Sequence, residues 1–323
     1  MQQQQLFDTF GRLHNYLRIS LTDACNLRCT YCMPEESATV TAAKKLMQPD
    51  EIFAISEEFV KCGVNKIRLT GGEPLVRKEA GLIMKKLSAL PVELSISTNA
   101  VLVDKFIDDF KAAGIRSVNV SLDTLDEALF FQITKRGDFA RIYNNILLLL
   151  QNEFIVKLNI VVMKGVNEGA IFDFVNLTKD FPLDVRFIEF MPFQGNRWNR
   201  EKVISKAEML SLISGQFRFD KLPDGINDTA RMFLANGHKG RFGFISTITE
   251  PFCDGCNRLR LTADGKIKNC LFSQSETDLL GAYRSGAELR PLIQQNLSDK
   301  MKELGGRGDM ENIENRSMIR IGG

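Results

Sequence analysis

The sequence predicts an α/β fold: a partial (β/α)6 TIM-like barrel of which a C-terminal segment closes the open side. Six short runs rich in β-branched residues alternate with helical patterns between residues 16 and 191, and this pattern changes after the sixth run. Alternating strands and helices favour a parallel sheet with helices outside, and closing a complete barrel needs more units than these. The length, 323 residues, suits one such domain with a smaller appendage.

The expected elements follow one another in order. Strands are predicted at 16–21, 66–70, 92–97, 117–122, 155–163 and 185–190, and helices at 49–62, 78–90 and 140–152. The first helix begins with Pro49, Asp50 and Glu51. Proline fits the first turn, and acidic side chains stabilise the positive end of the helix dipole. We divide the chain into a flexible N-terminal tail (1–12), the partial barrel (13–228) and a C-terminal region (229–323).

One face of each expected strand is polar, unlike the strands of a closed barrel, which pack apolar side chains on both faces. If the apolar faces pack on the helices, the polar faces line an interior that holds solvent or ligand, because unpaired charge is costly to bury dry. The basic members of this lining are Arg18, Lys66, Arg68 and Lys157. For any single one, a solvent-facing edge position is the alternative, but together they favour a polyanionic ligand such as a triphosphate.

Three cysteines, Cys25, Cys29 and Cys32, have the spacing C-x3-C-x2-C. A structural zinc site needs a fourth ligand. Thiolates in short runs also hold iron–sulfur clusters, and three protein ligands leave one iron of a [4Fe–4S] cluster open to another molecule. From this run alone, a structural zinc knuckle and a chance cluster remain as alternatives.

A second triad, Cys253, Cys256 and Cys270, has the spacing C-x2-C-x13-C. Neither histidine, His14 or His238, is spaced as a partner, although His238 could complete a zinc site with this triad. A zinc ribbon lacking one ligand and loop disulfides are the alternatives. The polar N-terminus does not read as a secretory signal, so clustered cysteines favour metal sites over disulfides.

Further motifs follow the expected strands, at the carboxyl ends where α/β barrels bind ligands. Gly71-Gly72-Glu73-Pro74 follows the second strand, and Thr98-Asn99-Ala100 ends the third. Ser121-Leu122-Asp123 ends the fourth, and Met191-Pro192 ends the sixth. Glycines in such turns allow a ligand to approach the backbone closely.

Taken in order, the two triads, these turns, the run Asn257-Arg258-Leu259-Arg260 and the final Gly322-Gly323 resemble one enzyme family. The sequence resembles the radical S-adenosylmethionine (SAM) GTP 3',8-cyclases of molybdenum cofactor biosynthesis, from about residue 12 to the end. The first triad indicates only the superfamily, whereas the second triad with Arg-Leu-Arg and the glycine tail indicates the family. Two positions depart from the pattern: Ala24 stands where a basic residue is common, and Ala100 replaces a glycine.

The resemblance implies two [4Fe–4S] clusters and SAM as cofactors. Cys25, Cys29 and Cys32 would hold the cluster that binds SAM, and Cys253, Cys256 and Cys270 the cluster that faces the substrate. SAM contacts are implied for Tyr31, through its backbone, and for Gly72, Ser121 and Met191. GTP contacts are implied for Arg18, Lys66, Arg68, Thr98, Lys157, Arg258 and Arg260. Arg258, Arg260, Gly322 and Gly323 are the residues expected to act in catalysis.

The reaction implied by the resemblance is that of a lyase. Reductive cleavage of SAM gives a 5'-deoxyadenosyl radical, which takes hydrogen from C3' of GTP, and the sugar radical adds to C8 of the guanine. Reduction then gives (8S)-3',8-cyclo-7,8-dihydroguanosine 5'-triphosphate, in the first step of molybdenum cofactor biosynthesis. Implied partners are a flavodoxin- or ferredoxin-type electron donor and a downstream pyranopterin monophosphate synthase, and a homodimer stays open.

Charge and hydropathy exclude other classes. The net charge is +2, from 42 basic and 40 acidic residues, which does not suggest a nucleic-acid partner. No apolar run approaches the roughly 18 residues of a membrane helix, and we expect a cytoplasmic location.

The nearest alternative function is that of another radical SAM enzyme with an auxiliary cluster, of the peptide maturase type, which usually has more C-terminal cysteines. A non-enzymatic iron or zinc protein would not need the Gly-Gly-Glu-Pro turn.

Overall fold

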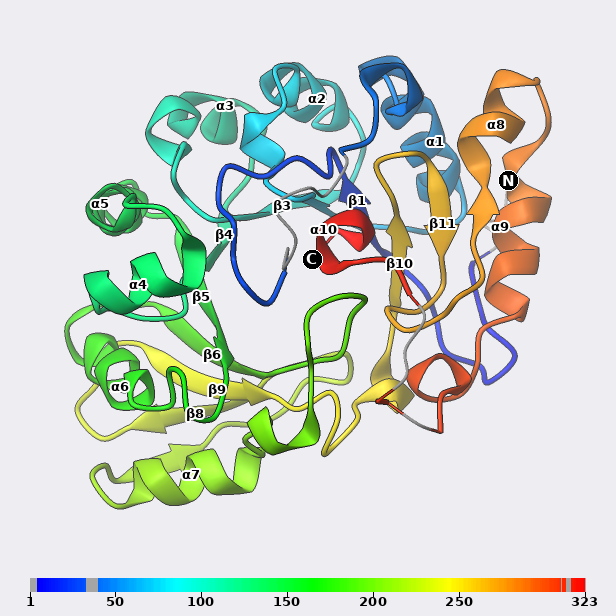
Figure 1. The fold of residues 1–323 in the computed structure, drawn as a ribbon. Helices are drawn as coiled ribbons and strands as arrows, with labels where there is room; N and C mark the ends of the chain where they lie inside the picture. The colour runs from blue at the N-terminus through cyan, green and yellow to red at the C-terminus, as the bar shows by residue number, and fades with distance from the viewer. Residues whose placement is uncertain (1–4, 33–39, 309, 312–314, 323) are drawn as a thin grey trace.

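The computed structural model describes residues 5–32, 40–308, 310–311 and 315–322. Its centre is a curved sheet in which six parallel strands follow one another in chain order (Figure 1). These strands are β1 (Tyr16–Ser20), β2 (Lys66–Thr70), β3 (Glu93–Thr98), β4 (Ser117–Ser121), β5 (Ile155–Val162) and β6 (Asp184–Glu189). All six predicted strands are confirmed, with ends that differ by one residue at most, because alternating β-branched runs are strong strand signals.

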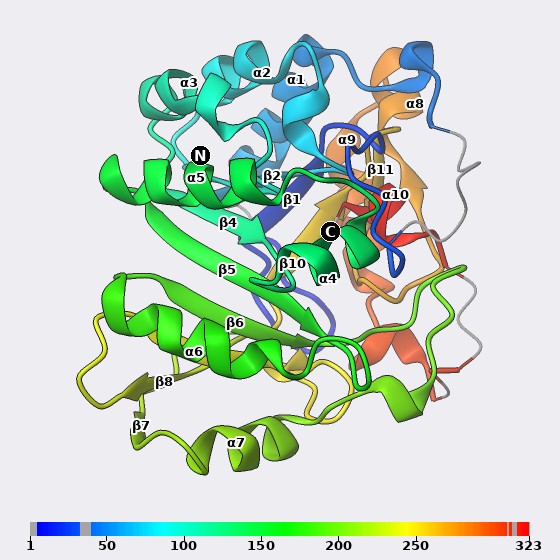
Figure 2. The ribbon, with the colours of Figure 1, turned by 60° about the vertical axis from the view of Figure 1, so that its left-hand side comes forward.

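Helices cover the outer face of these strands (Figure 2). They are α1 (Pro49–Lys61), α2 (Ala80–Leu87), α3 (Ile107–Ala112), α4 (Glu127–Thr134), α5 (Phe139–Gln151) and α6 (Ala170–Asp180). The start of α1 is confirmed, and the Glu51 carboxylate accepts a hydrogen bond from the Gln48 backbone N–H at 2.7 Å. The helix predicted at 78–90 is shorter at both ends than expected. Apolar side chains of the strands and helices, such as Leu17, Ile67 and Phe59, form one buried core between the two layers.

The C-terminal region extends the sheet at both edges, so the barrel stays open. Beside β6 lie β9 (Arg241–Ile245), β8 (Arg231–Ala235) and β7 (Phe219–Lys221), of which β9 runs parallel to β6. Beside β1 lie β10 (Arg258–Leu261), β11 (Lys266–Lys268) and β12 (Thr277–Asp278), of which β10 runs parallel to β1. The sheet is therefore continuous across the boundary predicted after residue 228.

The remaining helices lie at the rim and in the opening. They are α7 (Lys206–Ser214), α8 (Leu279–Arg284), α9 (Leu289–Ser298) and α10 (Met318–Ile321). Short 3-10 helices are η1 (Ala43–Lys45), η2 (Pro74–Val76), η3 (Val103–Lys105), η4 (Arg200–Lys202), η5 (Cys253–Gly255) and η6 (Leu304–Gly306). In Figure 1, α10 lies in the opening of the curved sheet, beside β1 and β10. Among the described residues, no helix is both long enough and apolar enough to cross a bilayer.

The N-terminal segment was expected to be a flexible tail over residues 1–12, but its described part is packed. Leu6 and Asp8 are buried, and the His14 N–H donates to the Leu6 carbonyl at 2.8 Å. Asp8 also accepts from the backbone N–H groups of Phe10 and Arg12, both at 3.0 Å, which fixes a local turn. Residues 1–4 lie outside the described part of the chain.

Candidate functional site

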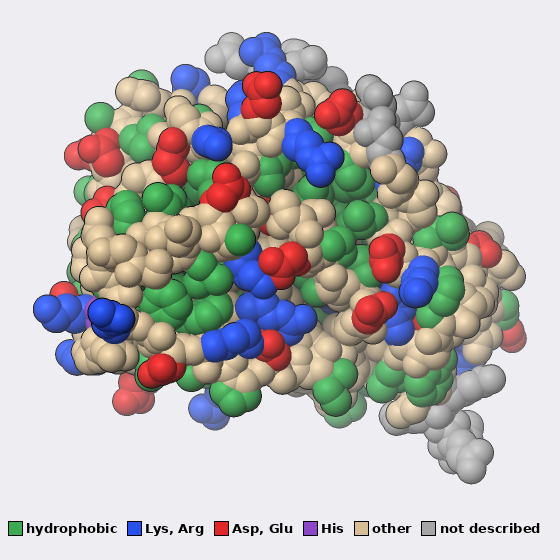
Figure 3. All heavy atoms as spheres, turned by 90° about the horizontal axis from the view of Figure 1, so that it is seen from below, with side chains coloured by type: hydrophobic (Ala, Val, Ile, Leu, Met, Phe, Trp, Pro, Cys, Tyr) green, Lys and Arg blue, Asp and Glu red, His purple; other side chains and the backbone are tan. Residues whose placement is uncertain are grey.

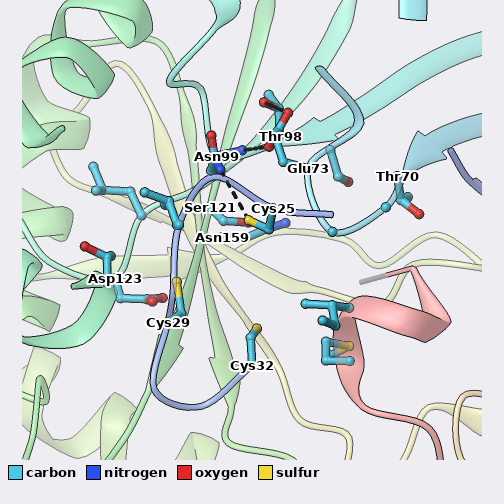
Figure 4. Close-up of a pocket in the computed structure, with 18 of the residues that line it drawn as sticks. Cys25, Cys29, Cys32, Thr70, Glu73, Thr98, Asn99, Ser121, Asp123 and Asn159 are labelled. Atoms are coloured by element: carbon cyan, nitrogen blue, oxygen red, sulfur yellow. Dashed lines mark hydrogen bonds between the residues drawn. The ribbon is translucent and has the colours of Figure 1, made fainter. Parts of the chain in front are cut away.

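A cavity lies at the carboxyl ends of β1–β5, and the first cysteine triad lines it (Figure 4). Other parts of its wall are the Gly71-Gly72-Glu73 turn, the ends of β3, β4 and β5, and α10. The residues implicated from sequence that line it are Arg18, Cys25, Cys29, Tyr31, Cys32, Gly72, Thr98 and Ser121. Segments that are distant in the sequence thus form one pocket, at the end of the sheet where α/β folds bind ligands.

The first triad sits on the loop after β1. The Arg28 guanidinium donates to the carbonyls of Cys25 and Leu27 and so ties this loop together. Burial, and then the nearby Glu73 carboxylate, raise the pKa of the Cys25 thiol to about 11. Burial and the neighbouring thiols likewise raise the pKa of Cys29 and Cys32. These thiols stay protonated unless a metal centre takes the sulfur, because a metal-bound thiol loses its proton. The three cysteines of the first triad therefore suit a thiolate-ligated cluster.

A glycine turn holds the cysteine loop in place. The Gly72 N–H donates to the Thr22 carbonyl at 2.6 Å, and the Glu73 N–H donates to the Ala24 carbonyl at 2.8 Å. A Cβ on Gly72 would lie 2.4 Å from the Ala24 carbonyl oxygen, so no other residue fits here without movement of the loop. The glycine is therefore required for the loop that carries Cys25 to approach β2.

Buried hydrogen bonds link this turn to β3 and to the triad. The Glu73 carboxylate accepts from the Thr98 hydroxyl at 2.8 Å and from the Asn99 N–H at 2.7 Å, and burial raises its pKa to about 7. The Asn99 side-chain amide donates to Cys25 Sγ at 3.8 Å (Figure 4). Ala100 has a left-handed φ of +64°, and its carbonyl accepts from the Asn145 side-chain amide at 2.7 Å.

On the opposite wall, Tyr31 and Asp123 form a second buried pair. The Tyr31 hydroxyl donates to Asp123 Oδ2 at 2.6 Å, and the Val161 N–H donates to Asp123 Oδ1 at 2.9 Å. Burial raises the pKa of Asp123 to about 6. This pair fixes the position of the triad loop relative to β4 and β5, beside Ser121 and Asn159, which are opposite each other in the sheet register.

Basic side chains form a row across the interior of the sheet. Arg260, Arg18 and Arg68 are register neighbours on β10, β1 and β2, so their side chains project from the same face. Burial lowers the pKa of Arg18 well below its usual value, and Arg260 and Arg68 lower it further. Like charges on adjacent strands destabilise a sheet unless an anion lies between them. Figure 3 shows Lys and Arg side chains gathered near the centre of the face seen from below.

The row continues on the far strands. Burial, and then the charges of Arg186 and Arg68, lower the pKa of Lys157 to about 8. Arg186 on β6 was not identified from sequence, and burial and Arg68 lower its pKa to about 10. Among the described residues, the Nε atoms of Arg68, Arg186 and Arg258 are buried without a hydrogen-bond partner. Lys66 differs, because its ammonium is paired with Glu93 at 2.8 Å.

The second triad lies around the start of β10 and the end of β11. Cys253 is in η5, and Cys256 and Cys270 flank the hairpin formed by these two strands. Burial favours the neutral Cys256 thiol, but the charges of Arg258 and Lys300 outweigh it and lower its pKa to about 6. The lowered pKa favours the thiolate form of Cys256, and its basic environment fits an anionic cluster. His238 does not complete a site there, because its ring bonds to the Thr178 hydroxyl at 2.8 Å.

Among the described residues, no three His, Cys, Asp or Glu side chains are placed to share a single metal ion. This finding concerns single-ion sites alone, because a cubane cluster presents a separate iron to each thiolate.

The C-terminal tail enters the interior beside the arginine row. Arg260 Nη1 donates to the Gly322 carbonyl at 2.7 Å, and Gly322 has a φ of +83°. A Cβ on Gly322 would lie 2.6 Å from Thr70 Oγ1 and 3.0 Å from Ser20 Cβ. The tail is anchored upstream by Arg316, which pairs with Asp264 through two hydrogen bonds of 2.8 and 3.0 Å. Gly323, also expected to act in catalysis, lies outside the described residues.

Family models match both parts of the chain. Residues 19–178 match the Radical SAM superfamily, and residues 183–305 match Molybdenum Cofactor Synthesis C. The GTP 3',8-cyclase of Peptoclostridium acidaminophilum is 41% identical over 326 residues, which cover 98% of each chain. The chain belongs to the GTP 3',8-cyclase family.

Other members of the family are similar along nearly the whole chain. The mitochondrial GTP 3',8-cyclase of Arabidopsis thaliana is 46% identical over 325 residues, covering 98% of this chain and 83% of that protein. Molybdenum cofactor biosynthesis protein 1 of Mus musculus is 44% identical over 324 residues, and the chain spans 51% of its length. The solved structure of Streptococcus suis SuiB bound to S-adenosylmethionine has a TM-score of 0.61 at 17% identity, covering 90% of this chain and 70% of that one. That likeness shows the fold alone.

The structure separates the residues implied by the family into two groups. Those of the first cluster and of SAM, except Met191, share the cavity with Arg18 and with Thr98, whose hydroxyl is bonded to Glu73. Lys66, Arg68, Lys157, Arg258 and Arg260 lie outside the cavity wall. Met191 also lies outside it, in a small apolar cluster with Phe272, Ile321 and Cys270. The individual roles of these residues in this family member stay predictions.

Four residues with evident roles at the site were not assigned from sequence: Glu73, Asn99, Asp123 and Arg186. For Arg186 the signal was present, because it alternates with Val185 and Phe187 as Arg18 alternates with Leu17 and Ile19. The other three belong to strand-end motifs, but their partners come from separate loops that only the fold brings together.

Proposed function

We propose that the chain is a SAM-dependent lyase, a GTP 3',8-cyclase that converts GTP to (8S)-3',8-cyclo-7,8-dihydroguanosine 5'-triphosphate in the first step of molybdenum cofactor biosynthesis. The observation that carries this proposal is that the first cysteine triad and a row of largely half-buried arginines share one interior. Arg18 belongs to both, because it lines the cavity of the triad and is flanked in register by Arg68 and Arg260. A phosphate-bearing substrate held by the row would therefore reach the triad.

Two cofactor sites follow from the same arrangement. Cys25, Cys29 and Cys32 would hold one [4Fe–4S] cluster with SAM, and Cys253, Cys256 and Cys270 a second one near the substrate. When bound, the first cluster supplies the electron that cleaves SAM to the 5'-deoxyadenosyl radical. The walls formed by Gly72 and Ser121 would position SAM, with Tyr31 and Asp123 holding the cluster loop against β4 and β5.

The protein's own part in the reaction is binding and orientation. A primary alkyl radical attacks most C–H bonds, so the position of the ribose decides which hydrogen is taken. Arg18, Arg68 and Arg260 would hold the triphosphate by charge-assisted hydrogen bonds, which relieve the repulsion within the row. The tail, fixed through the Gly322 carbonyl on Arg260, would close the substrate side of the cavity against water.

No observation favours the peptide maturase alternative. The likeness to SuiB concerns the fold alone, and a peptide would not require a row of arginines on the interior face of the sheet. The electron donor of flavodoxin or ferredoxin type, the downstream pyranopterin monophosphate synthase, a homodimer and a cytoplasmic location stay predictions.

The direct test is anaerobic reconstitution with iron and sulfide, followed by incubation with GTP, SAM and dithionite. Mass spectrometry should detect 5'-deoxyadenosine, methionine and a new nucleotide that is an isomer of GTP, because one hydrogen atom leaves the ribose and one proton and one electron are added later. SAM cleavage without a new nucleotide, in protein with both clusters, would contradict the proposal.

A further inference from the structure

A buried lysine contacts the second cysteine triad and has no role in the function described above. Lys300 is 4% exposed, and its ammonium donates to the Asn269 carbonyl, next to Cys270 in the chain. The same nitrogen lies 3.8 Å from Cys256 Sγ. Lys300 therefore connects the two loops that carry Cys256 and Cys270.

The Arg12 side chain fixes the backbone that follows Lys300. Lys300 follows α9, and the next two backbone carbonyls, of Met301 and Lys302, accept from the Arg12 guanidinium at 3.1 and 2.7 Å. Arg12 Nη1 also donates to the Cys253 carbonyl at 2.8 Å. The Arg12 Nε–H donates to Asp8 Oδ2 at 2.6 Å, and this same carboxylate oxygen bonds His14 Nε2 at 3.0 Å. The N-terminal segment thus clamps residues 300–302 against the triad.

The buried ammonium of Lys300 needs an anion beside it. A buried ammonium is costly unless an anion lies beside it. Among the described residues, no Asp or Glu carboxylate is within ion-pair distance of Lys300, so the neighbouring anion is the Cys256 sulfur. A thiolate-ligated cluster carries its negative charge in this place, and hydrogen bonds and charges near the sulfurs set its reduction potential.

The two triads differ in this respect. The sulfur of Cys25 in the first triad accepts from Asn99, a neutral amide, whereas that of Cys256 lies beside a buried cation. A cation stabilises the reduced, more negative form of a cluster over the oxidised form. The second cluster should therefore be reduced more readily than it would be without the lysine.

We propose that Lys300 is a positioning residue of the second triad, which raises the reduction potential of the cluster bound there and retains its irons. The inference rests on the proposed function in one respect, that the second triad holds a [4Fe–4S] cluster. It concerns a residue that touches a cysteine ligand and neither SAM nor GTP.

The test uses the full-length chain with the first triad changed to serine, so that one cluster remains after anaerobic reconstitution. Potentiometric titration followed by EPR compares Lys300→Met, Lys300→Gln and Lys300→Arg with that parent. Lys302→Met is the matched control, because its side chain is exposed and only its backbone carbonyl is used. Iron loss to a chelator is measured in parallel.

Lys300→Met and Lys300→Gln should lower the potential, with the equilibrium constant for reduction falling on the order of tenfold, which is about 59 mV for one electron. Lys300→Arg should keep most of the parent potential, and Lys302→Met all of it. Iron loss should be faster in the two neutral variants. If Lys300→Met takes up no iron, the comparison of glutamine with arginine decides, because the potential must follow the charge.

A cluster whose potential and iron retention are the same with glutamine, arginine or lysine at position 300 would overturn the inference alone. A shift of equal size in Lys302→Met would do so as well. If the parent with only the second triad holds no iron, the proposal of two clusters fails, and this inference fails with it.

Discussion

Gly322→Ala is the substitution that should separate SAM cleavage from cyclisation. The new Cβ would lie 2.6 Å from Thr70 Oγ1 and 3.0 Å from Ser20 Cβ, in a residue with a φ of +83°. A left-handed backbone costs a residue with a Cβ roughly 1–2 kcal/mol. Displacement of the tail to relieve this overlap would break the bond from Arg260 to the Gly322 carbonyl.

The left-handed backbone term alone corresponds to a loss of about five- to thirtyfold in occupancy of the bound tail, and the overlap with Thr70 and Ser20 adds to this loss. Cyclisation of GTP, measured by mass spectrometry under single-turnover conditions, should fall by at least this factor. Iron content and GTP binding should change little, because both triads and most of the arginine row are untouched. Gly308→Ala is the matched control, since a Cβ there meets nothing within 4 Å.

A peptide with the sequence of the last dozen or so residues, added in trans, should restore part of the cyclisation in the Gly322→Ala protein. Full activity of Gly322→Ala without peptide would refute the reasoning that the bound tail acts in catalysis. An equal loss in Gly308→Ala would refute it too, because the effect would then come from the C-terminal segment in general.

Four further predictions follow from the site. Arg68→Ala should weaken GTP binding about ten- to hundredfold with SAM affinity nearly unchanged, and equal binding of GTP and guanosine in calorimetry would contradict the triphosphate assignment. The reconstituted chain should hold about eight irons and eight sulfides, and a content of one zinc per triad with no iron would exclude clusters. Cys25→Ala should abolish SAM cleavage. Cys256→Ala should retain part of the SAM cleavage but lose GTP turnover. GTP affinity should fall as the pH rises through about 8, because the pKa of Lys157 is lowered to about 8 and its charge is lost above that pH; Lys157→Arg should remove this step, and a wild-type affinity that is constant from neutral pH to well above that value would contradict it. Ala100→Gly should raise the free energy of unfolding by about 1 kcal/mol, since Ala100 has a φ of +64°, and an unchanged or lower denaturation midpoint would show that the loop bears no strain.

The strand pattern alone predicted strands β1–β6 and the interior position of the basic side chains on them. Arg18 and Arg68 alternate with fully buried Leu17, Ile19 and Ile67, and this period of two places them on the interior face before any coordinates are known. Arg186 follows the same rule. The neighbours of these strands could not be read in this way, because β7, β8 and β9 form after a change of pattern and join the sheet at β6.

Loop contacts were the least predictable part. The bonds of Glu73 to Thr98 and Asn99, and of Tyr31 to Asp123, join residues 25 or more positions apart, and no local pattern encodes such pairs. The flexible tail predicted over residues 1–12 was wrong for its described part, and for a different reason. The sequence does show a turn signal here, an aspartate three residues before Gly11, and Asp8 accepts from the N–H groups of Phe10 and Arg12. The turn is held against the rest of the protein by the bond from Arg12 to the distant Cys253 carbonyl, which no local pattern predicts.

The most direct test of the central claim is the fate of the hydrogen on C3' of the ribose. GTP carrying deuterium at C3' should transfer that deuterium to 5'-deoxyadenosine, and the cyclised nucleotide should lose it, because on the proposed function the arginine row would hold the triphosphate so that the ribose faces the first triad. The same GTP with Arg260→Ala should give less transfer for each SAM cleaved. SAM cleavage in the intact chain with deuterium retained in the nucleotide would contradict the account.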